Sequence, residues 1–228
     1  MKKNNVFFCG ILTILLASGL MSCATSNVII ENVGAVPSSA LSGKTVMLEI
    51  GMAEWNRAVI PLLDAQLYNA ALNRVLDQFD RLQTEQLIDL HSQLALFYSD
   101  LYQAEVVSAR FPFEVTDNIS YSAPGNYFDN LNPAEIQIIR NIAAANNAEY
   151  VLAIIGQIRT VGVGAFGRNG TNRLFFNMAL FDRSGGIVAK GVVGSAPVRS
   201  PPGDVHSLAS MFNSAIPSLR SLLRAIGS

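Results

Sequence analysis

Short apolar or alternating runs along the chain predict five strands, and the residues between the last two predict how those two pair. The run at 150–155 is apolar at every position, which is typical of a central strand covered on both faces. A Ser-Gly-Gly turn at 184–186 separates the last two runs and predicts a β-hairpin. The five runs cover residues 44–50, 111–116, 150–155, 173–182 and 187–193.

Apolar residues that recur every three or four positions predict helices between these strands. We expect one helix after Pro61, a second that Thr84 caps, and a third that begins at Asn132 with a capping box. A last helix begins at Asp204, and Pro217 is expected to kink or split it. This element order is typical of an α/β domain, a mixed sheet with helices packed on it.

The first 22 residues predict a bacterial lipoprotein signal. Two lysines at positions 2 and 3 precede an apolar run about as long as a signal-peptide core. The run ends in Leu-Met-Ser-Cys at 20–23, which resembles the lipobox, where a leucine and a small residue precede an invariant cysteine. The resemblance implies lipidation of Cys23, cleavage before it, and acylation of the new amino terminus. The alternative is an ordinary secretory signal with an unrelated cysteine.

The residues after Cys23 predict where the anchored protein lies and where its domain begins. In bacteria that resemble the enteric ones, Ala24 after the cysteine implies export to the outer membrane. Residues 24–43 are rich in Ser, Asn, Ala and Gly, which is typical of a tether. The chain is therefore expected to comprise a signal peptide (1–22), a lipidated N-terminus with its tether (23–43) and a single domain (44–228).

Composition and charge exclude several classes of protein. Half of the 228 residues are hydrophobic, 14% are charged, and the formal net charge is −1. A nucleic-acid-binding protein would carry a clustered basic surface, and a disordered chain would be poorer in apolar residues. Removal of the signal would take away Cys9, and lipidation would occupy the Cys23 sulfur. The mature protein would then have no free thiol for a disulfide, for catalysis or for a metal.

The residues that usually carry chemistry are sparse. The glycines of 162–167 match a dinucleotide fingerprint, but the next segment alternates like a strand and does not read as a helix. Two histidines are too few for a typical catalytic zinc site: His91 lies on an apolar helix face, where we expect packing, and His206 is expected to be exposed. Asp77 and Asp80 indicate a solvated helix side. We expect no catalytic residue, no cofactor and no metal, so the protein is not expected to be an enzyme.

Two stretches resemble segments of known envelope lipoproteins. Residues 136–158 combine an alanine-rich helix with Asn-Ala-Glu-Tyr-Val-Leu, a strand and a glycine, and residues 179–189 form the Asp-x-Ser-Gly-Gly-Ile-Val hairpin. They are similar to the TolB amino-terminal domain, the LpoB activator of peptidoglycan synthases and the curli-secretion lipoprotein CsgG. The resemblance follows the element order over about 44–193, with the helix from Thr84 as an insertion. It implies a TolB-N/CsgG-like fold that binds proteins and has no catalytic residues.

These predictions combine into a lipid-anchored envelope protein, in the outer membrane and facing the periplasm, which binds an envelope protein or further copies of itself. The candidate interaction patch is Phe97, Tyr98 and Tyr102, with Trp55 nearby in sequence; alternatively this aromatic stripe is core. Two other functions stay open. One is a membrane-perturbing or pore-associated lipoprotein with the helix 208–226 lying on the bilayer, and the other is a carrier of a lipid or small ligand.

Overall fold

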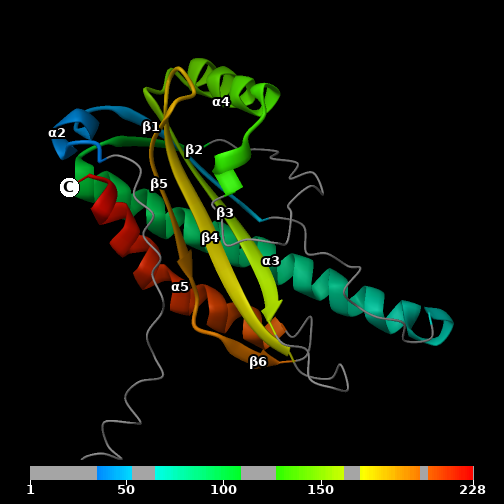
Figure 1. The fold of residues 1–228 in the computed structure, drawn as a ribbon. Coiled ribbons are helices and arrows are strands. Elements are labelled where there is room, and N and C mark those ends of the chain that lie inside the picture. The colour runs from blue at the N-terminus through cyan, green and yellow to red at the C-terminus, as the bar shows by residue number, and fades with distance from the viewer. Residues whose placement is uncertain (1–34, 53–64, 109–126, 162–169, 201–204, 228) are drawn as a thin grey trace, which may run out of the picture.

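The computed structural model describes residues 35–52, 65–108, 127–161, 170–200 and 205–227 as a mixed sheet with helices on both faces (Figure 1). The elements follow one another as α2 (Ser38–Leu41), β1 (Thr45–Met52), α3 (Ala65–Tyr102), β2 (Glu105–Ser108), the 3-10 helix η2 (Tyr127–Asn130), α4 (Pro133–Ala145), β3 (Tyr150–Val161), β4 (Gly170–Asp182), β5 (Ile187–Gly194), β6 (Val198–Ser200) and α5 (Val205–Ile226).

The strand pairing confirms the predicted α/β fold with a mixed sheet. The strand order is β2-β1-β3-β4-β5, and β6 pairs with β4 outside this path. β1 is parallel to both β2 and β3, whereas β4 is antiparallel to β3, β5 and β6. The predicted hairpin is therefore present as β4 and β5. The uninterrupted apolar run of β3 is explained by its position between β1 and β4, covered on both faces.

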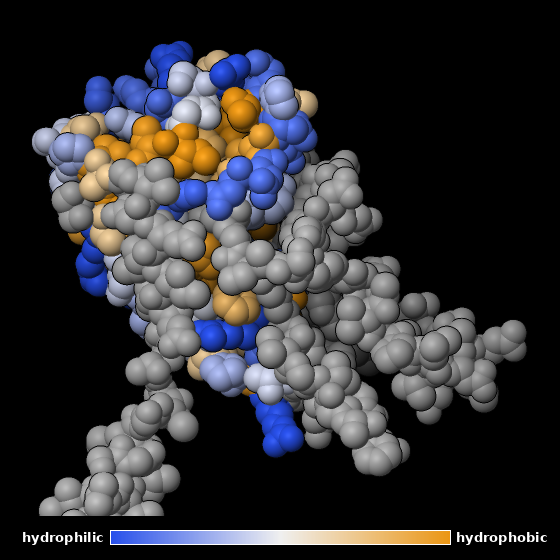
Figure 2. All heavy atoms as spheres, viewed as in Figure 1, coloured by the Kyte–Doolittle hydropathy of each residue, from blue (hydrophilic) through white to orange (hydrophobic). Residues whose placement is uncertain are grey.

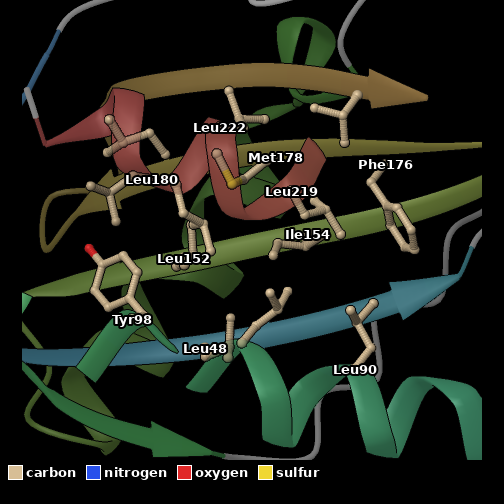
Figure 3. Close-up of a cluster of buried hydrophobic side chains, with 14 of the residues drawn as sticks. Leu48, Leu90, Tyr98, Leu152, Ile154, Phe176, Met178, Leu180, Leu219 and Leu222 are labelled. Carbon is tan, nitrogen blue, oxygen red and sulfur yellow. The ribbon is translucent and has the colours of Figure 1, made fainter. Parts of the chain in front are cut away.

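Alternate residues of the strands face two separate cores, because successive side chains of a strand point to opposite faces. Leu48 and Leu152 belong to a large core under α3 and α5, while Met47 and Val151 belong to a smaller core under α4 and η2. Figure 3 shows the larger core, with Leu219 of α5 directed at the sheet beside Ile154. The sheet is thus the middle of three layers.

The predicted apolar stripe of α5 is the main cover of the larger core. Each of its eight residues is at most 1% exposed: Leu208, Met211, Phe212, Ala215, Leu219, Leu222, Leu223 and Ile226. Phe212 meets Phe176 of β4 edge to face, with ring centroids 5.6 Å apart. Pro217 does not split the helix as expected. Pro217 and Asn213, one turn earlier, are exposed, so water can satisfy the carbonyl that the missing N–H leaves unpaired.

One prediction about the first half of the chain is wrong, and one strand was not predicted. The two helices expected around Thr84 are one continuous helix, α3, because residues 65–102 contain no proline or glycine to interrupt it. The stretch 105–108, for which the sequence predicts no element, forms the short edge strand β2 directly after α3. The predicted strand at 111–116, like Pro61, lies outside the described residues.

The start of the third predicted helix is confirmed in detail. The Asn132 side chain accepts hydrogen bonds from the backbone N–H groups of Ala134 and Glu135 at 2.9 and 3.0 Å. In return, the Glu135 carboxylate accepts the Asn132 N–H at 2.7 Å. This is the capping box expected from the Asn-Pro-Ala-Glu sequence, with Pro133 in the first turn.

The packed domain begins before the predicted end of the tether. Val36 is 8% exposed and Leu41 is fully buried, and both belong to the larger core. The Val36 N–H also donates a hydrogen bond to the carbonyl of Ile226 at 2.9 Å. Residues 35–43 therefore pack on the domain, because burying these two side chains stabilises the contact. The rest of the predicted tether, 23–34, lies outside the described residues.

The packing of α5 on β5 depends on the absence of a side chain at Gly191. A Cβ added there would lie 2.5 Å from Cδ1 of Leu222, which is itself 1% exposed and has little space to move. We expect Gly191→Ala to lower the free energy of unfolding by about 1–3 kcal/mol, the usual cost of overpacking a core. Urea unfolding would measure the change.

Gly51→Ala is the matched control for that substitution. Gly51 also lies in a strand, but a Cβ added there meets nothing within 4 Å. The Gly51→Ala variant should therefore unfold at nearly the same urea concentration as the unchanged protein. Equal midpoints for the two variants would contradict close packing between Gly191 and Leu222.

Candidate interaction surface

The C-terminal half of α3 lies against β1, β2 and α5, and this position decides which of its residues are accessible. Leu90 and Leu94 are buried in the larger core. His91 is half-buried, and its Nε2 lies 3.2 Å from the carbonyl oxygen of Leu48 on β1. The prediction that His91 is a packing residue is confirmed.

Two of the four residues of the candidate patch are core residues. Tyr98 is 1% exposed and Tyr102 is 4% exposed, and their ring centroids lie 4.8 Å apart. Figure 3 shows Tyr98 within the larger core, close to Leu152. The prediction of an accessible patch is therefore wrong for both tyrosines, because the aromatic stripe of α3 faces α5 and the sheet. Trp55 lies outside the described residues.

Burial sets the ionisation of these phenols. It raises the pKa of Tyr98, with smaller contributions from Tyr102 and Tyr150. Burial also raises the pKa of Tyr102, and a hydrogen bond with the backbone of Gly227 opposes this change. The Tyr102 hydroxyl donates to the carbonyl oxygen of Leu223 near the end of α5. Both phenols stay neutral at physiological pH and act as structural groups.

Phe97, the remaining patch residue, is half-buried, and two arginine guanidinium groups lie over its ring in cation–π contacts. The Cζ atoms of Arg220 and Arg224 on α5 lie 5.5 and 5.1 Å from the centroid of its ring. Arg220 also donates through Nη2 to Oε1 of Gln93 at 3.3 Å. Within the part of the chain that the structure describes, no carboxylate forms an ion pair with either arginine. The ring therefore holds two guanidinium groups: that of Arg220 is half-buried, with its Nε atom buried, whereas Arg224 is exposed and available to an anion.

Exposed leucines flank this ring on α3. Leu96 is 69% exposed and Leu101 is 37% exposed. We call Leu96, Phe97, Leu101, Arg220 and Arg224 the Phe97 surface. It combines apolar side chains with guanidinium groups at the C-terminal ends of two helices. Such a combination suits contact with a surface that is itself both apolar and anionic.

The sequence contains a signal for this surface in the position of Leu96 on α3. The buried row of α3 steps through Leu87, Leu90 and Leu94, and Leu96 falls outside it. A large apolar residue off the buried stripe of an amphipathic helix indicates exposure. Contact between Phe97 and the arginines of α5 joins residues more than 120 positions apart, so local periodicity could not find it.

A second apolar area lies on the other side of the sheet. Figure 2 shows apolar residues gathered at the end of the molecule that carries α4. Ile138 of this helix is 44% exposed. The two areas are separated by the sheet, because α4 covers the smaller core whereas α3 and α5 cover the larger one.

Several other predicted features lie outside the residues that the structure describes. The side chains of Asp77, Asp80 and His206, and the glycine-rich stretch 162–167, are not among the described parts. Among the residues that are described, no group of three His, Cys, Asp or Glu side chains could hold a metal ion. No helix in the described ranges has both the length and the apolar character needed to cross a membrane.

Comparison with known proteins yields weak structural similarity. No protein-family model and no curated protein matches the chain. Among solved structures, PelC from Paraburkholderia phytofirmans, a dodecamer, is 16% identical with a TM-score of 0.38, covering 86% of this chain and 96% of PelC. A putative neuraminyllactose-binding hemagglutinin homolog from Helicobacter pylori is 13% identical with a TM-score of 0.40, covering 84% of this chain and 88% of the homolog. Lipoprotein GNA1162 from Neisseria meningitidis is 14% identical with a TM-score of 0.30, and the match covers 76% of this chain and 98% of the GNA1162 chain.

At these identities and TM-scores the similarity carries no functional conclusion. None of the three structures is TolB, LpoB or CsgG, so the resemblance to those families stays a prediction. The function has to be argued from the chain's own residues.

The same substitution at the two buried tyrosines tests which hydroxyl contributes a hydrogen bond to stability. The Tyr98 hydroxyl is buried with no hydrogen-bond partner, whereas the Tyr102 hydroxyl is bonded to Leu223. Tyr98→Phe should leave the free energy of unfolding unchanged or raise it, since an unsatisfied polar group is removed. Tyr102→Phe should lower it by about 0.5–1.5 kcal/mol, the net contribution of one hydrogen bond.

Thermal and urea unfolding of both variants measure this difference, and each variant serves as the control for the other. If Tyr98→Phe proves the more destabilising of the two, the assignment of the hydrogen bond to Tyr102 is wrong.

Proposed function

We propose that this chain is a lipid-anchored protein of the bacterial cell envelope that acts by binding another macromolecule and not by catalysis. The observation that carries the proposal is the Leu-Met-Ser-Cys sequence at 20–23, placed after two lysines and an apolar run. Cys23 stands only 12 residues before position 35, the first described residue of the chain. Ala24 supports an outer-membrane location facing the periplasm.

The anchor gives the domain a physical means of acting. Each acyl methylene buried in a membrane contributes roughly 0.8 kcal/mol, so several chains hold the protein there for long periods. A short tether then raises the local concentration of the domain beside other membrane components. A weak contact surface is sufficient under these conditions, which fits a domain with small accessible apolar areas at Leu96 and Ile138.

The packing of α5 favours this function over membrane perturbation. The apolar face that would have to enter a bilayer is the stripe from Leu208 to Ile226, which is at most 1% exposed in the larger core. Insertion would require α5 to leave the sheet and expose the strands beneath it. Transfer of that much apolar surface to water opposes such a change.

Replacing the anchoring cysteine tests the proposal. In an expressing bacterium fed a labelled fatty acid, Cys23→Ala should abolish incorporation of the label, because the acceptor sulfur is absent. Cys9→Ala is the matched control: it removes the other cysteine of the chain, inside the predicted signal, and should leave labelling intact. Gel autoradiography and membrane fractionation give the readout. Label retained by Cys23→Ala would refute the lipid anchor.

A further inference from the structure

The tether joins the domain at the same end as the C-termini of α3 and α5. The Val36 N–H donates to the carbonyl of Ile226 at 2.9 Å, and the Ser38 hydroxyl contacts the carbonyl of Gly227. The Gly43 N–H donates to the carbonyl of Gln103, just after α3, at 3.0 Å. In Figure 1, α2 lies beside the C-terminal end of the chain, while α3 extends to the opposite side. The chain therefore leaves the domain next to the Phe97 surface.

The length of the tether limits the distance between this end and the membrane. Positions 23–34 comprise 12 residues, which reach roughly 40 Å when fully extended. The 38 residues of α3 span about 57 Å at 1.5 Å per residue, so its N-terminal end can lie far from the bilayer. The Phe97 surface lies at the attached end, so these 12 residues limit its distance from the bilayer more closely than that of the N-terminal end of α3.

We propose that the Phe97 surface rests on the phospholipid headgroups of the membrane that holds the anchor. This inference depends on the proposed lipidation of Cys23. Arg220 and Arg224 lie on one ring without a carboxylate partner among the described residues. Arg224 is exposed, and its planar guanidinium group can bind phosphate in a bidentate manner, whereas Arg220 is half-buried beside it. Leu96 and Leu101 supply exposed apolar side chains beside them.

Acidic residues near the Phe97 surface limit how strongly it is attracted to an anionic membrane. Asp89 and Asp100 are exposed on the same half of α3, and Asp89 accepts a hydrogen bond from Gln93, which in turn accepts one from Arg220. The surface is therefore not uniformly basic. Long-range attraction to an anionic membrane is small, and the contact depends on the anchor to keep phosphates at high local concentration. We expect the non-acylated domain not to bind vesicles by itself.

Site-directed spin labelling of the acylated protein tests the orientation. The protein is reconstituted in vesicles of phosphatidylethanolamine and phosphatidylglycerol, with a nitroxide attached through Leu96→Cys or, as the matched control, Ile138→Cys. Both positions are exposed in the structure, at 69% and 44%, but they lie on opposite faces of the sheet. The lipidated Cys23 sulfur does not react with the label. Accessibility to oxygen and to a water-soluble nickel chelate is measured by power saturation.

The label at 96 should be several-fold less accessible to the nickel chelate than the label at 138. The double substitution Arg220→Gln and Arg224→Gln should return the label at 96 to the aqueous value while the protein stays with the vesicles. The comparison of 96 with 138 needs no arginine variant, so it holds even if that variant folds poorly. Equal chelate accessibility at both positions in the vesicle-bound protein would overturn the proposal.

Two further measurements separate failure of the lipid anchor from failure of the membrane contact. Acyl labelling of the same preparation separates failure of the anchor from failure of the contact. If position 96 is aqueous on vesicles but shielded in native envelopes, the Phe97 surface belongs to a protein partner and the membrane proposal is wrong.

Discussion

The burial of α5 against one face of the sheet is the interaction on which the rest of the structure depends. Its eight apolar residues close the larger core, and Leu222 reaches β5 only because Gly191 has no side chain. The same helix presents Arg220 and Arg224 to Phe97, and its last carbonyls accept the hydrogen bonds of Val36 and Tyr102. Core, accessible surface and attachment of the tether are thus properties of one helix.

The two faces of the sheet differ in what they carry. The face under α3 and α5 holds the larger core, and the N-terminal segment from residue 35 joins the domain at the C-terminal ends of these helices. The face under α4 holds the smaller core, and Ile138 is accessible on its outer side. If the domain lies on its α3–α5 face as proposed, α4 faces away from the membrane, where a protein partner could reach it.

The sequence predicted elements whose signals are local. The capping box at Asn132, the hairpin around Gly185 and the apolar stripe of α5 each depend on neighbouring residues, and all three are present. The break expected at Thr84 is absent, because a polar stretch interrupts a helix only when it includes residues that disfavour helical backbone. The accessible surface could not be predicted in full, since Phe97 meets the arginines only after α3 and α5 pack together.

Attachment of the N-terminal segment to the last turn of α5 has a mechanical consequence. If Cys23 is lipidated as proposed, a pull through the acyl chains would arrive at residues 35–43, whose hydrogen bonds and buried side chains join them to the C-terminal ends of α3 and α5. The two long helices would then share the load at once, and it would not begin by peeling a strand from the edge of the sheet. A protein held between a bilayer and a moving partner would keep its sheet intact under such traction.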